Sequence, residues 1–137
     1  MRKVIFFILI CTSCTNSIDI ELTDKYCGAV FVLISNSITN ELKKVEVDKD
    51  GIGVVPVKYY KKNEGKNIVV LLNEQDITDK CNHFTYNQIS TDKNEIKEYL
   101  TFYVNCNSHG DFSLNKFDEE FNRLRSNNSK VKKWLEE

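Results

Sequence analysis

In the first ten residues of the chain, two positive charges precede an unbroken apolar run. Arg2 and Lys3 are followed by Val4–Ile10, all of them aliphatic or aromatic. Seven residues in a helix rise only about 10 Å, whereas the hydrocarbon core of a bilayer is about 30 Å thick, so the run is too short to span it. A short apolar segment after a basic start is typical of a secretory signal. We therefore expect residues 1–13 to be a signal peptide rather than a buried strand.

Two cysteines follow the apolar run directly. The segment Cys11-Thr12-Ser13-Cys14 resembles the lipobox of bacterial lipoproteins, in which a small residue precedes the cysteine that is acylated. Ser13 matches the small position and Cys14 the lipidated one, whereas Cys11 stands where that family usually has leucine. The resemblance implies that Cys14 becomes the first mature residue and holds the chain to the membrane through acyl chains, in which each buried methylene contributes about 0.8 kcal/mol. The alternative is an ordinary signal peptide cleaved near Ser13 or Ser17.

The remaining chain has the size and charge of one small domain. Removal of the first 13 of the 137 residues leaves 124, enough for a single hydrophobic core. Without Arg2 and Lys3, the 19 basic residues fall to 17 against 20 acidic ones, so the net charge is −3. This charge predicts no electrostatic attraction to nucleic acid or to anionic lipid. The pairs Lys43-Lys44 and Lys61-Lys62 are accordingly interpreted as solvated strand ends.

We predict a lipidated tether over residues 14–25 and a single β-rich domain over residues 26–137. The tether is polar and alternates only weakly, at Ile18, Ile20 and Leu22, and a short edge strand is the alternative. Strands are expected at Cys27–Ser35, in a hairpin over Leu42–Tyr60 with its turn at Asp50-Gly51, at Asn67–Asn73 and at Ile96–Cys106. Pro56 lacks a backbone donor, so the second hairpin strand should lie at a sheet edge or carry a bulge. Residues 74–95 are predicted to be a long connection.

From residue 113 onward, the apolar residues recur with the spacing of a helix. Ser113 suits a helix N-cap, and Ser126–Ser129 interrupts the periodic pattern before it resumes. One apolar stripe precedes the interruption and a second follows it, with the members Leu114, Phe117, Phe121 and Leu124, then Val131, Trp134 and Leu135. The expected fold is therefore mainly β, a small antiparallel β-sandwich or open sheet, with a C-terminal helical segment over residues 113–135 that covers one apolar face.

Three cysteines remain in the mature domain, and in an oxidising compartment two of them are expected to pair. Cys106 ends the last predicted strand, and Cys81 lies in the long connection that returns to it. Three pairings are possible, and we favour a Cys81–Cys106 disulfide, worth about 3 kcal/mol in loop-closure entropy, with Cys27 as a buried free thiol. No cofactor is expected. The alternative is a tetrahedral zinc site formed by Cys81, His83, Cys106 and His109.

The strand at Ile96–Cys106 has two distinct faces. One is apolar apart from Glu98, and the other carries Tyr99, Thr101 and Tyr103. An exposed aromatic row on a sheet can bind a partner, and tyrosine is a frequent anchor of protein interfaces. Tyr99 and Tyr103 are therefore the candidate partner-binding residues, unless a second sheet covers them.

Residues 28–60 contain an apolar strand, the Asp50-Gly51 turn, and Pro56-Val57 leading into Tyr59-Tyr60. These short motifs are similar to those of TssJ, the lipoprotein of type VI secretion systems. The resemblance implies a lipidated, transthyretin-like β-sandwich that docks a partner in a membrane complex. The long C-terminal helical segment and the additional cysteines are not part of that pattern.

The motifs of the chain favour binding over catalysis. The sequence contains no nucleophile elbow, helical zinc-protease motif or glycine-rich phosphate loop. We expect a non-enzymatic envelope lipoprotein that acts as a protein-binding, adaptor, inhibitor or immunity module, on the outer membrane facing the periplasm. A TssJ-like secretion component and a small envelope enzyme or metal-binding protein are the alternatives.

Overall fold

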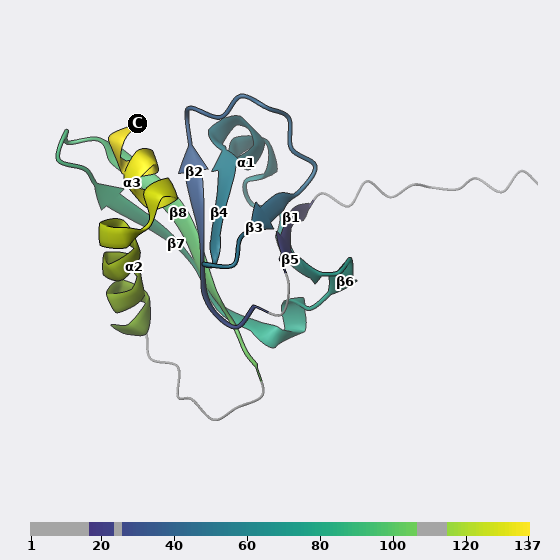
Figure 1. Ribbon diagram of the computed structural model, residues 1–137. Helices are drawn as coiled ribbons and strands as arrows, with labels where there is room; N and C mark the ends of the chain where they lie inside the picture. Colours follow the sequence, from purple (N-terminus) through teal and green to yellow (C-terminus); the bar gives the residue numbers. More distant parts are fainter. Residues whose placement is uncertain (1–16, 24–25, 107–114) are drawn as a thin grey trace, which may run out of the picture.

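The computed structural model describes residues 17–23, 26–106 and 115–137, and their strands form one strongly curled sheet (Figure 1). In spatial order the sheet is β6-β5-β1-β3-β4-β2-β8-β7. The strands are β1 (Ser17–Leu22), β2 (Gly28–Ser35), β3 (Val45–Val47), β4 (Ile52–Pro56), β5 (Asn67–Leu72), β6 (Gln75–Asp76), β7 (Cys81–Ser90) and β8 (Ile96–Val104). The helices are α1 (Val57–Asn63), α2 (Asn115–Asn127), α3 (Ser129–Glu136) and the 3-10 turn η1 (Thr78–Lys80). A mainly β fold with an open sheet and C-terminal helices is confirmed.

The first strand lies inside the sheet, between β3 and β5 and parallel to both. Ile18, Ile20 and Leu22 are buried on its inner side, because the curled sheet encloses that face. The prediction of a tether over residues 14–25 is therefore wrong for Ser17–Leu22. The weak alternation of this segment was the pattern of a strand with one buried face.

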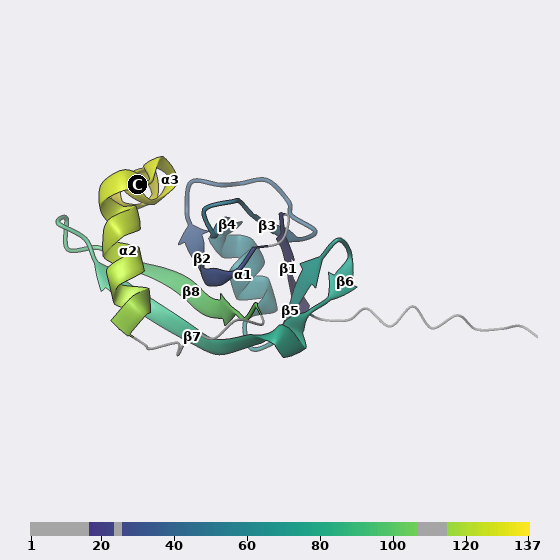
Figure 2. The ribbon, with the colours of Figure 1, turned by 60° about the horizontal axis from the view of Figure 1, so that its bottom comes forward.

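The inner face of the curled sheet encloses the larger core. Apolar residues of β1 and β8 belong to the same buried cluster, although they lie far apart in the strand order. Its fully buried or nearly buried members include Ile20, Leu22, Val30, Val32, Val45, Val47, Val55, Val70, Phe102 and Val104. Helix α1 packs on this cluster through Val57, Tyr59 and Tyr60 (Figure 2).

Helix α1 replaces the second half of the predicted hairpin strand. The strand β4 ends at Pro56, which is the N-cap of α1, with φ −61° and ψ 136°. Proline is compatible with this place, because the amide it lacks is one that a helix start leaves without an intrahelical partner. β4 lies between β3 and β2, so the prediction of an edge strand around Pro56 is wrong.

The outer face of β2, β4 and β8 is covered by α2 and α3. Phe117, Phe121 and Leu124 pack on Phe31 and Ile52, which confirms the predicted apolar stripe of the first helix. Ser113 and Leu114 lie outside the described residues.

The break predicted at residues 126–129 is the junction between α2 and α3. The Asn128 side chain caps α3 by accepting hydrogen bonds from the backbone amides of Lys130 and Val131. Trp134 in α3 is 1% exposed and donates its indole N–H to the Ile34 carbonyl at 2.8 Å. This bond joins α3 to the end of β2.

The turn between β3 and β4 requires a glycine. Asp48 accepts hydrogen bonds from the amides of Asp50 and Ile52, and Gly51 adopts a φ of +78°. A Cβ at Gly51 would lie 2.1 Å from the Tyr26 hydroxyl oxygen, which donates to the Ala29 carbonyl. The predicted turn at Asp50-Gly51 is therefore present, and it packs directly on the segment that enters β2.

Candidate functional site

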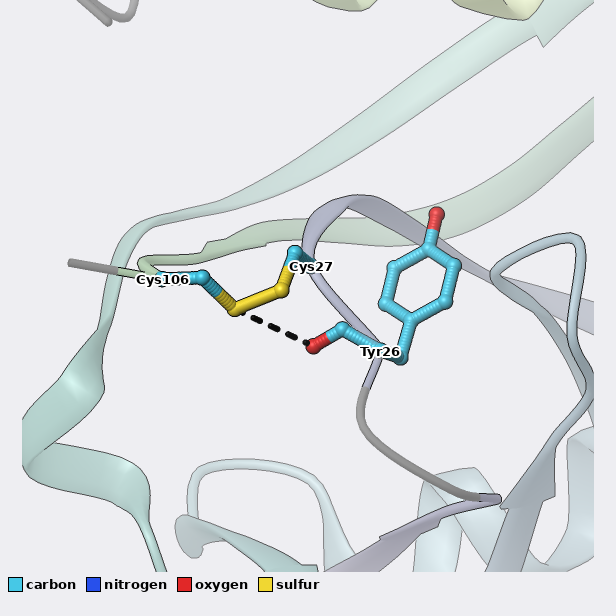
Figure 3. The surroundings of a disulfide bond; sticks show 3 residues. All are labelled: Tyr26, Cys27 and Cys106. Atoms are coloured by element: carbon cyan, nitrogen blue, oxygen red, sulfur yellow. Dashed lines mark hydrogen bonds between the residues drawn. A yellow bond between two sulfur atoms is a disulfide. The ribbon is translucent and has the colours of Figure 1, made fainter. Parts of the chain in front are cut away.

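The predicted disulfide is wrong, because the structure pairs Cys27 with Cys106 (Figure 3). Cys27 directly precedes β2, and Cys106 follows β8 after one residue. These strands are antiparallel neighbours, with Gly28 opposite Val104, so the two cysteines meet with their Cα atoms 5.6 Å apart. Both lie at the surface. Cys27 is therefore neither buried nor a free thiol.

Cys81 is the free cysteine among the described residues. It opens β7, packs on the inner core and donates its thiol to the Ile77 carbonyl at 3.5 Å. Burial, with the charges of Asp79 and Asp76, raises the pKa of the thiol to about 11. The group is therefore protonated at neutral pH, which makes it a poor nucleophile.

The alternative zinc site loses one of its four ligands to the disulfide. Cys106 has its sulfur bonded to Cys27, and His109 lies outside the described residues. Within residues 17–23, 26–106 and 115–137, no group of three or more histidine, cysteine, aspartate or glutamate side chains is placed to hold a metal ion.

The structure covers Tyr99 and Tyr103, which the sequence placed in an exposed partner-binding row. The Tyr99 ring stacks on Phe121 with centroids 4.7 Å apart, and it meets Trp134 edge-on at 6.0 Å. Tyr103 is half-buried and packs on the same outer core. Helices α2 and α3, rather than a second sheet, provide this cover. The prediction of an exposed aromatic row on this face is therefore wrong.

The strand beside β8, β7, has an open edge. The sequence predicted this segment to be part of a long connection. β7 pairs with β8 on one side and is the last described strand of the sheet. Its ten residues, CNHFTYNQIS, include no lysine, arginine, aspartate, glutamate or proline. Edge strands are usually protected from further pairing by such residues. We call the side of β7 that faces away from β8 the open edge.

β7 itself carries two exposed aromatic side chains. Phe84 is 37% exposed and stacks on Phe102 with centroids 5.1 Å apart. Tyr86 is 42% exposed and stacks on Tyr60 of α1 at 6.0 Å. Burial, together with a hydrogen bond to Glu98 and its negative charge, raises the pKa of the Tyr86 hydroxyl to about 12. The side chain is therefore neutral at physiological pH.

A β-bulge limits the regular part of the open edge. The register between β7 and β8 shifts between Asn82 and Thr85, where His83 has a φ of +56°. From Thr85 to Ser90 the pairing is continuous. A bulge bends the strand and increases its twist, so this regular stretch is the part suited to a further strand.

Sequence reasoning missed β7 because of its composition. Asparagine, histidine, glutamine and serine rarely favour strands, and they make up half of the segment. The alternation of Phe84 and Tyr86 with polar residues was the signal that could have found it.

No helix among the described residues is both long and apolar enough to cross a bilayer.

Comparisons with known proteins show a distant structural similarity. No family model and no curated protein matches the chain. Among solved structures, the chain is similar to a candidate lipoprotein from Bacillus anthracis, with 13% identity and a TM-score of 0.47 over 82% of this chain and 96% of that one.

Proposed function

We propose that this chain is a lipid-anchored envelope protein that binds a partner protein along the open edge of β7, without catalysing a reaction. The observation that carries the proposal is the edge itself, which is long, uncharged and flanked by exposed Phe84 and Tyr86. An adaptor, an inhibitor and an immunity protein would each use such a surface.

Strand addition is the binding mode that fits this edge. An extended segment of a partner would hydrogen-bond to the backbone of Thr85–Ser90, as in other complexes formed by β-augmentation. Phe84 and Tyr86 would contact its side chains, and tyrosine is enriched among the residues that dominate binding energy. Because β7 carries no charged residue, we infer that the bound segment is itself uncharged.

The first prediction tests the anchor. Cys14→Ser should abolish incorporation of labelled fatty acid into the chain, because the lipobox resemblance places the acylated sulfur at this residue. Cys11→Ser is the matched control and should leave the label in place. The measurement is labelling of the full-length chain in a bacterial host. Labelling of the Cys14→Ser variant at the wild-type level would contradict the anchor, and an unlabelled wild type would support an ordinary signal peptide.

The second prediction tests the open edge. The partner is captured from native envelope by cross-linking to the wild-type chain, identified by mass spectrometry and purified. Tyr86→Lys with Gln88→Lys should weaken its binding by about 30-fold or more, because the two charges oppose strand addition and one aromatic anchor is lost. Both lysines would lie near Glu98, which already hydrogen-bonds to Gln88, so the sheet should tolerate them.

The matched control places the same charges elsewhere on the sheet. Gln75→Lys with Asn67→Lys alters the opposite edge strand, β6, and the exposed first residue of its neighbour β5. This variant should bind the partner as the wild type does. Equal affinities of the two double variants would disprove the proposed edge, provided that both retain the wild-type circular dichroism spectrum.

A further inference from the structure

Lysines are concentrated in two segments of this otherwise acidic chain. Residues 41–44 and 57–66 contain six lysines, against the two acidic residues Glu41 and Glu64. The lysines are Lys43, Lys44, Lys58, Lys61, Lys62 and Lys66. Since the chain after the predicted signal has a net charge of −3, these segments differ in sign from the rest of the domain.

The sheet topology brings the two segments to the same end of the molecule. β3 and β5 flank β1 in parallel, so all three strands start at one end, with Ser17 opposite Asn67 and Ile20 opposite Val45. Lys44 directly precedes β3, and Lys66 directly precedes β5. Glu21 of β1 also reaches this region and forms an ion pair with Lys44 at 3.4 Å, so the positive charge of the region comes mainly from the other lysines. We call this region, with the exposed side of α1, the basic end.

Helix α1 contributes three lysines on one face. Lys58, Lys61 and Lys62 have the i, i+3, i+4 spacing that puts side chains on one side of a helix, and all three are exposed. The helix contacts β1, β2 and β4. The Tyr59 hydroxyl donates to the Lys43 carbonyl at 3.4 Å, so the helix and the lysine pair before β3 are in direct contact.

The proposed lipid anchor would be attached to the chain at this same end. Only two residues separate Cys14 from Ser17, the first residue of β1. Three extended peptide units reach about 10 Å, which is close to the Debye length at ordinary ionic strength. A lipid on Cys14 would therefore hold the basic end within electrostatic range of the membrane surface.

We propose that the basic end binds anionic phospholipid headgroups and orients the domain on the bilayer, an inference that rests on the proposed anchor at Cys14. The charges are complementary, and the short connection keeps them close to the lipid. The net charge of −3 predicted no attraction to anionic lipid. That expectation treats the charge as evenly spread, whereas a local field depends on where the charges lie.

The test uses the mature chain from residue 14 with Cys14→Ser, so that no acyl chain contributes. Binding is measured by sedimentation with vesicles made of equal parts phosphatidylglycerol and phosphatidylcholine, and with vesicles of phosphatidylcholine alone. Binding should require phosphatidylglycerol and weaken as salt is added. Each lysine near an anionic surface contributes about fivefold, so Lys58→Gln with Lys61→Gln and Lys62→Gln should lower the partition coefficient by about 100-fold.

The matched control removes three exposed lysines from outside the basic end. Lys49→Gln with Lys80→Gln and Lys116→Gln makes the same change in net charge and should lower binding less than threefold, because these lysines lie on the β3–β4 turn, on η1 and at the start of α2. Equal loss in the two triple variants, or no preference for phosphatidylglycerol, would overturn the proposal. Fatty-acid labelling of Cys14 is measured separately, so a failed anchor and a failed lipid surface give different results.

Discussion

Replacing both cysteines of the Cys27–Cys106 bond by serine is expected to lower the free energy of unfolding by about 4.5 kcal/mol at 25 °C. The two cysteines are 79 residues apart, so the bond removes a large loop-closure entropy from the unfolded chain. Domains of this size are stable by only about 5–15 kcal/mol, so the variant should lie close to unfolding. Urea titration followed by circular dichroism under non-reducing conditions measures the change.

Cys81→Ser is the control for this experiment. The residue is half-buried and lies outside the bond, so its replacement should cost less than about 1.5 kcal/mol, through a small loss of packing and one weak hydrogen bond. If the Cys27→Ser/Cys106→Ser variant were as stable as the wild type, or if peptide mapping linked Cys81 to Cys106, the pairing in the structure would be wrong.

Trp134→Ala should lower the free energy of unfolding by about 4 kcal/mol, which corresponds to a fall of about 15 °C in melting temperature. The indole is 1% exposed, packs against Tyr99 and donates to the Ile34 carbonyl. Its loss leaves a cavity between α3 and β2 and removes the donor from that carbonyl. Because Trp134 is the only tryptophan, thermal unfolding is followed by circular dichroism rather than by fluorescence.

Trp134→Phe separates the two contributions. Phenylalanine keeps much of the buried apolar area but cannot donate to Ile34, so it should cost about 1–3 kcal/mol. A loss as large as that of Trp134→Ala would mean that the hydrogen bond dominates. A melting temperature of Trp134→Ala within a few degrees of the wild type would contradict the packing of α3 on the sheet.

The elements that sequence reasoning predicted best are those with a strong period and one buried face. In β8, Leu100, Phe102 and Val104 are buried on the inner side as expected, whereas Ile96, predicted on the same face, is exposed. Phe117 and Phe121 in α2 lie on the predicted helical stripe. In both cases local pattern and tertiary burial favour the same structure, so the sequence alone was sufficient.

The elements that were missed depend on contacts distant in sequence. Tyr59 and Tyr60 favour a strand by their propensity, but α1 forms because Pro56 ends β4 and the inner core accepts the tyrosine rings. The disulfide could not be assigned from spacing, since it depends on the pairing of β2 with β8. The open edge of β7 and the basic end likewise follow from strand order, which no local pattern encodes.

The strand order also determines when this chain can fold. β1 is the first described strand along the chain, yet its neighbours β3 and β5 come later, and β2 pairs with β4 but gains its second neighbour only with β8. Folds dominated by such non-local pairing form slowly, because loops must close before the contacts stabilise them. The eight-stranded sheet is therefore incomplete until Val104 has been synthesised. For a protein that is exported as proposed, late completion of the sheet favours translocation and acylation of the chain before the fold is closed.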